Sequence, residues 1–313
     1  MSYRRNIIFD TDIAGDCDDV IALCLLCAAH KRGECTLSAV TSSMPSKGAM
    51  MCTLCIIGEY GLCGIPAYNM TDPEKDYYPK HHEDDIYGIK TSDKFYENYA
   101  DKAQLVRENP VKALRRLLAE SNEKFTLAVT GPLYNIGRLL DSEADEISPL
   151  DGVSLVREKV ELLAVMGGNF ENTLKNYPEI FAEWNIKCDI KAAKTTVDKC
   201  PVKTVFLPFE AGYDMITGAE NVKKYGEDRP SSYSFICHGS KNGRHSWDPA
   251  TILYAVCGEY CCFEESPAGK ISIDDNGITS FSECENGLHH FLRLKKSKEE
   301  IASIIDKLIE NDR

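Results

Sequence analysis

The segment Ile7-Ile-Phe-Asp-Thr-Asp-Ile-Ala-Gly-Asp-Cys-Asp-Asp19 joins an apolar run to the start of a helix through a group of carboxylates. The run from Asn6 to Phe9 is short and apolar, which is typical of a buried strand. From Asp18 onward, apolar residues recur at the spacing of a helix that is buried over much of its circumference. We expect Asp16 or Asp18 to cap this helix, because carboxylates stabilise its positive N-terminal end.

Five carboxylates lie within ten residues, at Asp10, Asp12, Asp16, Asp18 and Asp19. So many like charges repel one another unless a cation neutralises them. Ligands that are all oxygen suit a hard cation such as Ca²⁺ or Mg²⁺ better than zinc. A solvated acidic turn is the alternative, but a turn needs one or two acids rather than five directly after an apolar strand. The cluster therefore predicts a metal site between the first strand and the first helix.

Strands and helices alternate along the rest of the chain. Further strands are expected at residues 36–41, 125–129, 160–166 and 203–207, and further helices at 48–60, 110–120, from 132, at 190–198 and at 297–310. This alternation favours an α/β fold with an open, mainly parallel sheet flanked by helices, related to the Rossmann fold. A small C-terminal β-hairpin is expected from residues 270–273 and 278–281. Residues 66–100 and 225–246 are interpreted as loops, and residues 1–313 as a single domain.

The composition argues against several classes of partner. With 49 acidic against 36 basic residues the formal charge is −13, and such a surface repels nucleic acid. No apolar run reaches the roughly 20 residues that span a bilayer, and the run before Asp10 is too short for the core of a signal peptide. The pairs Cys24/Cys27 and Cys52/Cys55 lie in stretches typical of helices. We therefore expect reduced core cysteines and a cytoplasmic protein.

Polar residues and glycines follow the other expected strands. Thr130-Gly-Pro132, Met166-Gly-Gly-Asn169 and Glu210-Ala-Gly212 each begin where a strand ends. Ligands of open α/β sheets bind at this edge, and glycine lets the backbone approach them closely. Late in the chain, Ser246-Trp-Asp-Pro249 opens an apolar helix. Asp248 is therefore either the N-cap of that helix or a member of the shared pocket.

Taken together, these residues resemble the inosine–uridine-preferring family of nucleoside hydrolases, calcium-dependent enzymes with an open α/β fold. The resemblance covers roughly residues 5–258, with a compatible tail. It is carried by Ile7–Asp12 with Asp18-Asp19, Val129–Asn135, Met166–Gly168, Glu183–Asn185 and Trp247–Pro249. It implies hydrolysis of the N-glycosidic bond of ribonucleosides to free base and ribose. It also implies a small-molecule nucleoside substrate and a homodimer or homotetramer.

The resemblance assigns roles to individual residues. Asp12 matches the acid that contacts the metal and deprotonates the metal-bound water. The implied Ca²⁺ ligands are Asp12, Asp19, Asp248 and the backbone carbonyl of Thr130. The expected substrate-binding residues are Asp18, Met166, Asn169, Glu183, Asn185 and Trp247. The residue types suit this chemistry, because cleavage passes through an oxocarbenium-like sugar and needs an activated water.

The chain departs from the common family pattern in the loop Ser42–Ser46, where the family usually has an asparagine for the ribose, in the loop before Glu183, and at two further places. The first acidic loop has two more residues and one more acid than D-x-D-P-G-x-D-D, so Asp16 has no counterpart. The family often has a histidine before the late metal-binding aspartate, where it helps the base to leave, but this position is Trp247. His245 is a candidate replacement. His81, His82, Tyr225 and Tyr233 are further candidates for contact with the base. The base preference is not predicted.

Two other functions are compatible with parts of the pattern. A phosphatase of the haloacid dehalogenase type would use Asp10 as nucleophile and Asp12 as acid, with Lys199 or Lys203 as its lysine. It would leave the residues around Glu183 and Trp247 without a role. A non-catalytic ribose- or nucleoside-binding protein would keep the metal site, but it would not need Asp12 as a base.

Overall fold

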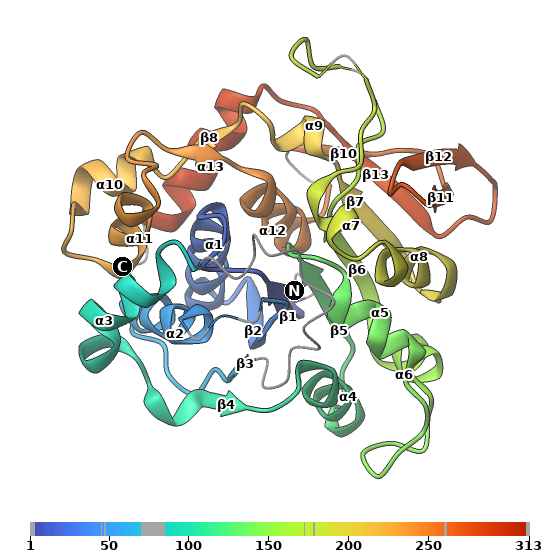
Figure 1. Ribbon diagram of the computed structural model, residues 1–313, viewed down its shortest axis with the longest axis horizontal. Coiled ribbons are helices and arrows are strands. Elements are labelled where there is room, and N and C mark those ends of the chain that lie inside the picture. The colour runs from blue at the N-terminus through green and yellow to red at the C-terminus, as the bar shows by residue number, and fades with distance from the viewer. Residues whose placement is uncertain are drawn as a thin grey trace.

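A large sheet forms the centre of the computed structural model, which describes residues 4–44, 46, 48–69, 85–171, 173–177, 179–259 and 262–310 (Figure 1). Its strands are β1 Arg5–Thr11, β2 Cys35–Ser42, β3 Ala67–Asn69, β4 Leu105–Arg107, β5 Phe125–Val129, β6 Val160–Met166, β7 Thr204–Leu207, β10 Phe263–Glu265, β11 Gly269–Ile273, β12 Thr279–Glu283 and β13 His289–Leu294. The order is β12-β11-β13-β7-β6-β5-β1-β2-β3-β4, and β10 pairs with β13. All pairings from β13 to β4 are parallel, whereas β10, β11 and β12 pair antiparallel.

Strand β1 lies in the middle of the parallel part because its residues are apolar on both faces. Ile7 and Phe9 point into one hydrophobic core and Ile8 into the other. A parallel sheet that helices cover on both sides requires this continuous apolar character. The polar residues of the segment therefore begin only where the strand ends.

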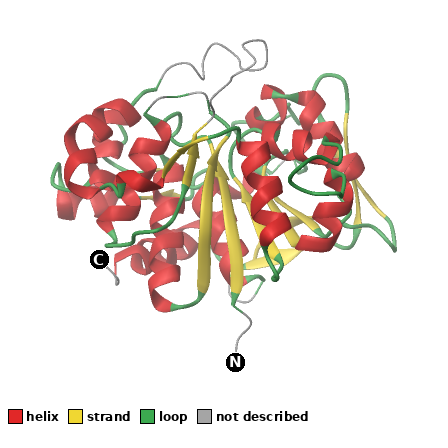
Figure 2. Cartoon of the chain, turned by 90° about the horizontal axis from the view of Figure 1, so that it is seen from below, coloured by secondary structure: helices red, strands yellow, loops and turns green. Residues whose placement is uncertain are grey.

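Helices cover both faces of the sheet (Figure 2). The core that contains Ile7 is built with α1 Asp18–Arg32, α2 Ala49–Glu59, α10 Ala219–Tyr225, α11 Pro230–His238, α12 Trp247–Cys257 and α13 Lys298–Glu310. The core that contains Ile8 is built with α4 Pro110–Glu120, α5 Tyr134–Asp141, α6 Gly152–Lys159 and α8 Ile190–Lys199. Two short helices, α7 Trp184–Cys188 and α9 Phe209–Gly212, lie after β6 and β7. They bring side chains to the carboxyl edge of the sheet.

The expected alternation of strands and helices is confirmed. The elements at 110–120, 125–129 and 160–166 have the bounds that the sequence predicts, and β11 and β12 form the expected antiparallel hairpin. Strand β13 was not expected, and it extends the parallel part of the sheet beside β7. Both C-x-x-C pairs lie buried in α1 and α2. None of the described helices is long and apolar enough to cross a membrane.

The two expected loops are partly wrong. Residues 66–100 include β3 and helix α3 (Gly88–Tyr99), and residues 225–246 include helix α11. Both helices bury small polar residues where an apolar pattern would be expected, and Thr91 of α3 shares a 2.9 Å hydrogen bond with Ser234 of α11. Such a pair satisfies its own polar groups, so it packs in the interior without an apolar periodicity. Residues 70–84, with His81 and His82, lie outside the described residues.

The expected helix caps are also wrong. The N-cap of α1 is Cys17, and the N-cap of α12 is Ser246; neither makes a side-chain capping bond. Asp18 and Asp248 instead occupy the first turns of the two helices. Their carboxylates are therefore free for other contacts, and the N-cap interpretation of Asp248 does not hold.

Candidate active site

Three buried carboxylates come together where β1 ends and helices α1 and α12 begin. Oxygen atoms of Asp18, Asp19 and Asp248 all lie within 4.8 Å of one another, and Asp12 faces the same cavity. Burial, followed by the charges of neighbouring acids, raises the pKa of Asp12, Asp18 and Asp248 well above the usual range. A fold that places these groups together without a cation carries an electrostatic cost.

The hydrogen bonds of the described residues leave one fully buried oxygen of the three carboxylates without a partner. Oδ1 of Asp19 accepts from the hydroxyls of Thr11 and Thr130 (2.9 Å for Thr130). Oδ2 of Asp18 accepts from the backbone N–H groups of Trp247 and Asp248, at 3.1 Å each. Oδ2 of Asp19 is buried and has no hydrogen-bond partner among the described residues. An orphaned carboxylate oxygen beside two further carboxylates fits a hard cation, so the donor set passes this test.

Asp10 is buried next to the site and does not line the cavity. Its Oδ2 accepts from Thr41 Oγ1 at 2.6 Å and from Asn135 Nδ2 at 2.7 Å, and burial raises its pKa to about 7. Gly131 allows the ends of β1 and β5 to approach, since a Cβ there would lie 2.9 Å from the backbone nitrogen of Asp12. Asp10 thus joins the strand ends that hold Asp12.

This placement argues against the phosphatase alternative. A nucleophile must reach its substrate, and Asp10 is buried outside the cavity. Lys199 pairs with Asp141 and Lys203 pairs with Glu265, and neither lysine lines the cavity. The lysine that such a phosphatase needs is therefore not brought to the cluster by either candidate.

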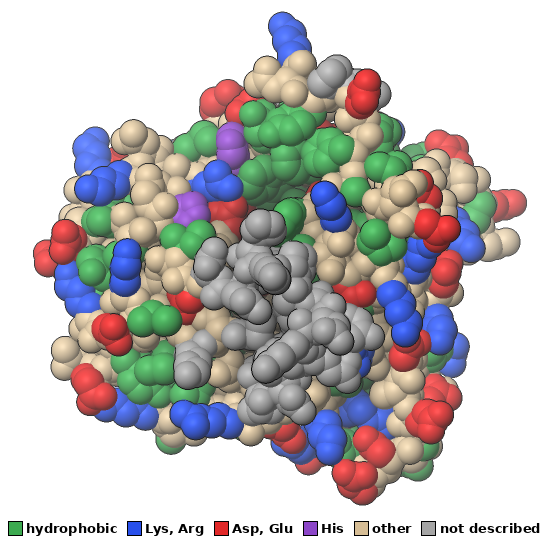
Figure 3. Space-filling model, in the orientation of Figure 1, with side chains coloured by type: hydrophobic (Ala, Val, Ile, Leu, Met, Phe, Trp, Pro, Cys, Tyr) green, Lys and Arg blue, Asp and Glu red, His purple; other side chains and the backbone are tan. Residues whose placement is uncertain are grey.

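A cavity of about 630 Å³ opens above the carboxylates (Figure 3). Every predicted site residue except Asn169 lines it: Asp12, Asp18, Asp19, Thr130, Met166, Glu183, Asn185, Trp247 and Asp248. Asn169 is buried beside it, where its Nδ2 donates to Glu210 Oε2 at 3.0 Å and its backbone N–H donates to Thr279 Oγ1 at 3.0 Å. Asn169 therefore holds the turn after β6, and its substrate contact stays a prediction.

Glu183 and Asn185 form one wall of the cavity. Glu183 is the N-cap of α7, and its carboxylate accepts from the backbone N–H groups of Asn185, Ile186 and Gly168 at 3.0 to 3.3 Å. Burial raises the pKa of Glu183 to about 7. Nδ2 of Asn185 donates to the backbone carbonyl of Thr130 at 2.7 Å. Asn185 thus fixes the carbonyl that the family resemblance assigns to the metal.

Another part of the cavity wall is aromatic. The indole Nε1 of Trp247 donates to the carbonyl of Phe209 at 2.8 Å, and the two rings stack with centroids 5.2 Å apart. Tyr213 stacks on His245 at 4.5 Å, and Tyr177 contacts both Phe209 and Tyr213 edge-on. These rings pack against one another, and an aromatic cavity wall suits contact with the flat ring of a base.

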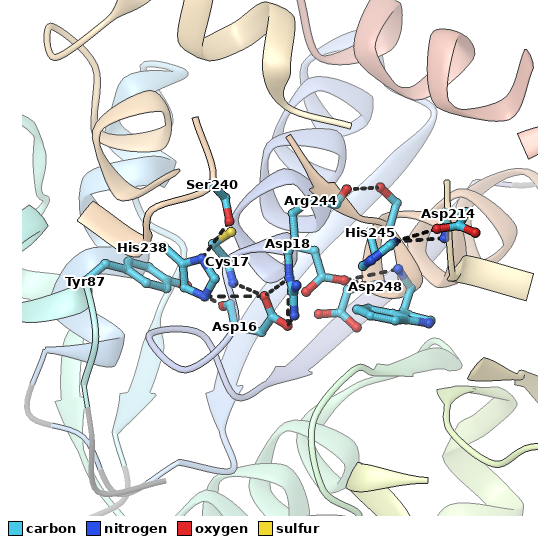
Figure 4. A network of polar contacts seen from close by, with 12 residues as sticks. Asp16, Cys17, Asp18, Tyr87, Asp214, His238, Ser240, Arg244, His245 and Asp248 are labelled. Atoms are coloured by element: carbon cyan, nitrogen blue, oxygen red, sulfur yellow. Dashed lines mark hydrogen bonds and ion pairs between the residues drawn. The ribbon is translucent and has the colours of Figure 1, made fainter. Parts of the chain in front are cut away.

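A second polar group, formed by Asp16, His238 and Arg244, lines the cavity beside the acidic cluster (Figure 4). Nε of Arg244 donates to Asp16 Oδ1 at 2.8 Å, and its Nη2 donates to Asp16 Oδ2 at 2.5 Å. Nε2 of His238 lies 3.8 Å from Asp16. Hydrogen bonding to Arg244 helps hold the pKa of Asp16 below its ordinary value even though burial acts in the opposite direction. The additional acid of this loop is therefore paired with a cation of the protein.

A family model for inosine-uridine preferring nucleoside hydrolases matches residues 7–303, nearly the whole chain and beyond the range in which the resemblance is evident. The chain belongs to this family. Its members are metal-dependent N-glycosyl hydrolases, and the chain is an enzyme of that class. Among the curated proteins none matches the sequence.

Solved nucleoside hydrolases share the fold. An inosine-uridine preferring enzyme from Bacillus anthracis is 17% identical with a TM-score of 0.71, over 98% of this chain and 99% of that one. A purine-preferring ribonucleoside hydrolase from Gardnerella vaginalis is 14% identical with a TM-score of 0.73, over 98% and 99%. A plant nucleoside hydrolase is 17% identical with a TM-score of 0.70, over 99% and 100%. The small hairpin of β11 and β12 is an addition to the mainly parallel sheet.

Several cavity residues escape prediction from the sequence. Phe209 and Tyr213 follow β7, and Arg244 lies in a segment that was interpreted as a loop. Tyr225 and Tyr233, which were candidates for base contact, do not line the cavity. The one signal for Arg244 is the surplus acid Asp16, because a half-buried carboxylate requires a charged partner.

Proposed function

We propose that the chain is a calcium-dependent ribonucleoside hydrolase that releases free base and ribose, with Asp12 as the general base. The observation that carries this proposal is the buried group of Asp18, Asp19 and Asp248 beside a cavity that Asp12 also lines. Within this group the buried Oδ2 of Asp19 has no hydrogen-bond partner among the described residues. A cavity of about 630 Å³ falls in the range of small-molecule sites.

The proposed calcium ligands are Asp12, Asp19, Asp248 and the carbonyl of Thr130. All are oxygen donors, which favour Ca²⁺ over softer metals, and several carboxylates suit its flexible coordination. When bound, the cation lowers the pKa of a water and orients vicinal hydroxyl groups. Asn185 keeps the Thr130 carbonyl in place through its 2.7 Å hydrogen bond.

The protein's own groups then perform the remaining tasks. Asp12, which lines the cavity beside the acidic cluster, accepts a proton from the water that attacks C1′. Asp18, Glu183 and Asn185 bind the ribose hydroxyls, and Met166 lines the sugar pocket. Trp247 offers an aromatic face to the base. The cleaved bond is C1′–N, and its electron pair leaves with the base.

The test is release of free ribose from a panel of ribonucleosides with Ca²⁺, with excess EDTA and with Asp12→Asn. We expect EDTA to abolish release and Asp12→Asn to lower kcat by about 10²-fold to 10⁴-fold. Asp275→Asn, at a side chain that is 98% exposed, is the matched control and keeps full activity. Binding of a nucleoside without release of ribose would support a binding protein, and release of phosphate from sugar phosphates would support a phosphatase.

We further propose a single domain, a cytoplasmic location and a homodimer or homotetramer. The buried cysteines in helices α1 and α2 support a reducing environment. The net charge of −13 argues against nucleic acid as a partner. Light scattering on the purified protein measures the oligomeric state directly.

A further inference from the structure

The family often has a histidine that helps the base to leave, but this chain has Trp247 at that position, and tryptophan does not act as an acid. Nε1–H of Trp247 is already donated to the carbonyl of Phe209 at 2.8 Å. His245 does not replace it, because its Nδ1 accepts from the backbone N–H of Asp214 at 2.8 Å and its ring is stacked on Tyr213. An imidazolium would lose that acceptor, and burial lowers the pKa of His245 although the Asp214 carboxylate lies 3.8 Å from its Nδ1. Departure of the base needs another group.

Arg244 is the only lysine or arginine among the described residues that line the cavity. Its side chain is 32% exposed, and its Cζ lies 5.5 Å from the centre of the Trp247 ring. Asp16 holds Nε and Nη2, whereas Nη1 has no hydrogen-bond partner among the described residues. One edge of the guanidinium is thus fixed by the protein, and the other edge has donors to offer.

His238 is less suited to this role. Its Nδ1 shares a 2.8 Å hydrogen bond with Ser240, its ring stands edge-on to Tyr87, and burial lowers its pKa. Its Nε2 is 3.8 Å from the same Asp16 that holds Arg244. Arg244 keeps its charge at every working pH, so it can stabilise an anion continuously but cannot act as a proton donor.

We propose that Arg244 binds the departing base and stabilises the negative charge that the base acquires, and that Asp16 is the positioning residue for this arginine. The inference rests on the proposed function. Asp16 lies in the first acidic loop, which is two residues longer than in the common family pattern. The longer loop thus supplies the carboxylate that holds Arg244, and Arg244 takes over the role of the histidine that Trp247 replaces.

The reaction balances without an acid in the protein. The C1′–N bond breaks and its electron pair moves to the base nitrogen, while the water oxygen forms the new bond to C1′ and its proton passes to Asp12. The anionic base accepts a hydrogen bond from Nη1 of Arg244, and it takes a proton from solvent after release. Asp12 returns its proton to solvent. Ribose and neutral base are the products of one nucleoside and one water.

The test compares two ribosides that differ in how well the leaving group carries charge. Inosine has a poor leaving group, whereas 4-nitrophenyl β-ribofuranoside releases a phenolate that is stable in water without help. Removal of a donor that faces developing charge costs about 10²-fold to 10³-fold in kcat. We expect Arg244→Met to lose this factor on inosine and to keep a rate near that of the unchanged enzyme on the nitrophenyl riboside. Arg293→Met, at the exposed pair with Glu171, is the control and changes neither rate.

A second set of variants tests the role of Asp16. Asp16→Asn is expected to lower the inosine rate in part, and Asp16→Asn with Arg244→Met to equal Arg244→Met alone, because Asp16 acts only through the arginine. Arg244→Met alone leaves the carboxylate of Asp16 without its partner, which can impair folding. The double variant has no such carboxylate, so its rates can be measured even if Arg244→Met folds poorly.

The inference is overturned if Arg244→Met and the double variant lose both substrates equally, or if they lose neither. It is also overturned if His238→Gln, and not Arg244→Met, shows the loss confined to inosine. Failure of the proposed function is distinguishable, since the unchanged enzyme would then cleave neither riboside.

Discussion

Replacing Asp19 with asparagine is expected to stabilise the metal-free protein and to weaken its response to calcium. Asp19 is fully buried, with Oδ1 facing the hydroxyls of Thr11 and Thr130 and Oδ2 without a hydrogen-bond partner among the described residues. An asparagine would keep its carbonyl oxygen toward the two threonines. Its amide would then take the place of Oδ2 and donate toward the carboxylates of Asp18 and Asp248.

The size of the effect follows from the charge. Burial, with the repulsion of neighbouring acids, raises the pKa of Asp19 from 3.8 to about 6. At 1.36 kcal/mol per pKa unit, ionisation in the folded state costs about 3 kcal/mol, which asparagine avoids. Because the folded pKa is raised, the cost is absent below about pH 4, grows as the pH rises and is complete above about pH 6. For 313 residues, about 3 kcal/mol corresponds to a rise in Tm of about 5 °C.

The assay is thermal unfolding at pH 8 and at pH 4, in EDTA and in 10 mM Ca²⁺, with Asp275→Asn as the surface control. We expect Asp19→Asn to melt above the unchanged protein in EDTA at pH 8, to match it at pH 4, and to gain less from calcium. An Asp19→Asn protein that melts at or below the unchanged one in EDTA at pH 8 would show that the carboxylate is not under electrostatic strain, and the reasoning would fail.

Two further outcomes follow from buried contacts. Arg115 is 2% exposed and donates hydrogen bonds to Asp145, Ser142 and two backbone carbonyls. Arg115→Met is therefore expected to lower the free energy of unfolding, measured in urea, by about 3–5 kcal/mol. Adding Asp145→Asn to this variant is expected to restore part of the lost stability. An unchanged urea midpoint would contradict this. Asn185→Leu removes the donor that fixes the Thr130 carbonyl, so calorimetry is expected to show calcium binding weakened about 10-fold to 100-fold, and equal affinity would argue against Thr130 as a ligand.

Local sequence patterns predict the parts of the site that depend on neighbouring residues. Asp12, Asp18 and Asp19 were found because they follow an apolar strand and begin a helix, and both features lie within one segment. Arg244 was missed because its partner Asp16 is 228 positions away, and no periodicity connects the two. Helix α11 was missed because its buried residues include Ser231 and Ser234, whose hydroxyls find the distant partners Glu59 and Thr91 only in the folded protein.

Asp18 also has partners that are far away in the sequence. It accepts hydrogen bonds from the backbone N–H groups of Trp247 and Asp248, which lie 229 and 230 residues later. During synthesis the chain emerges from its N-terminus, so the acidic loop is made long before the segment that begins α12. In that interval the nascent chain has neither the carboxylate of Asp248 nor the guanidinium of Arg244 to complete the loop. A product that terminates before residue 244 contains strands β1 to β7 but lacks both. Cation binding is therefore expected to report that translation has passed α12, and to separate finished molecules from truncated ones.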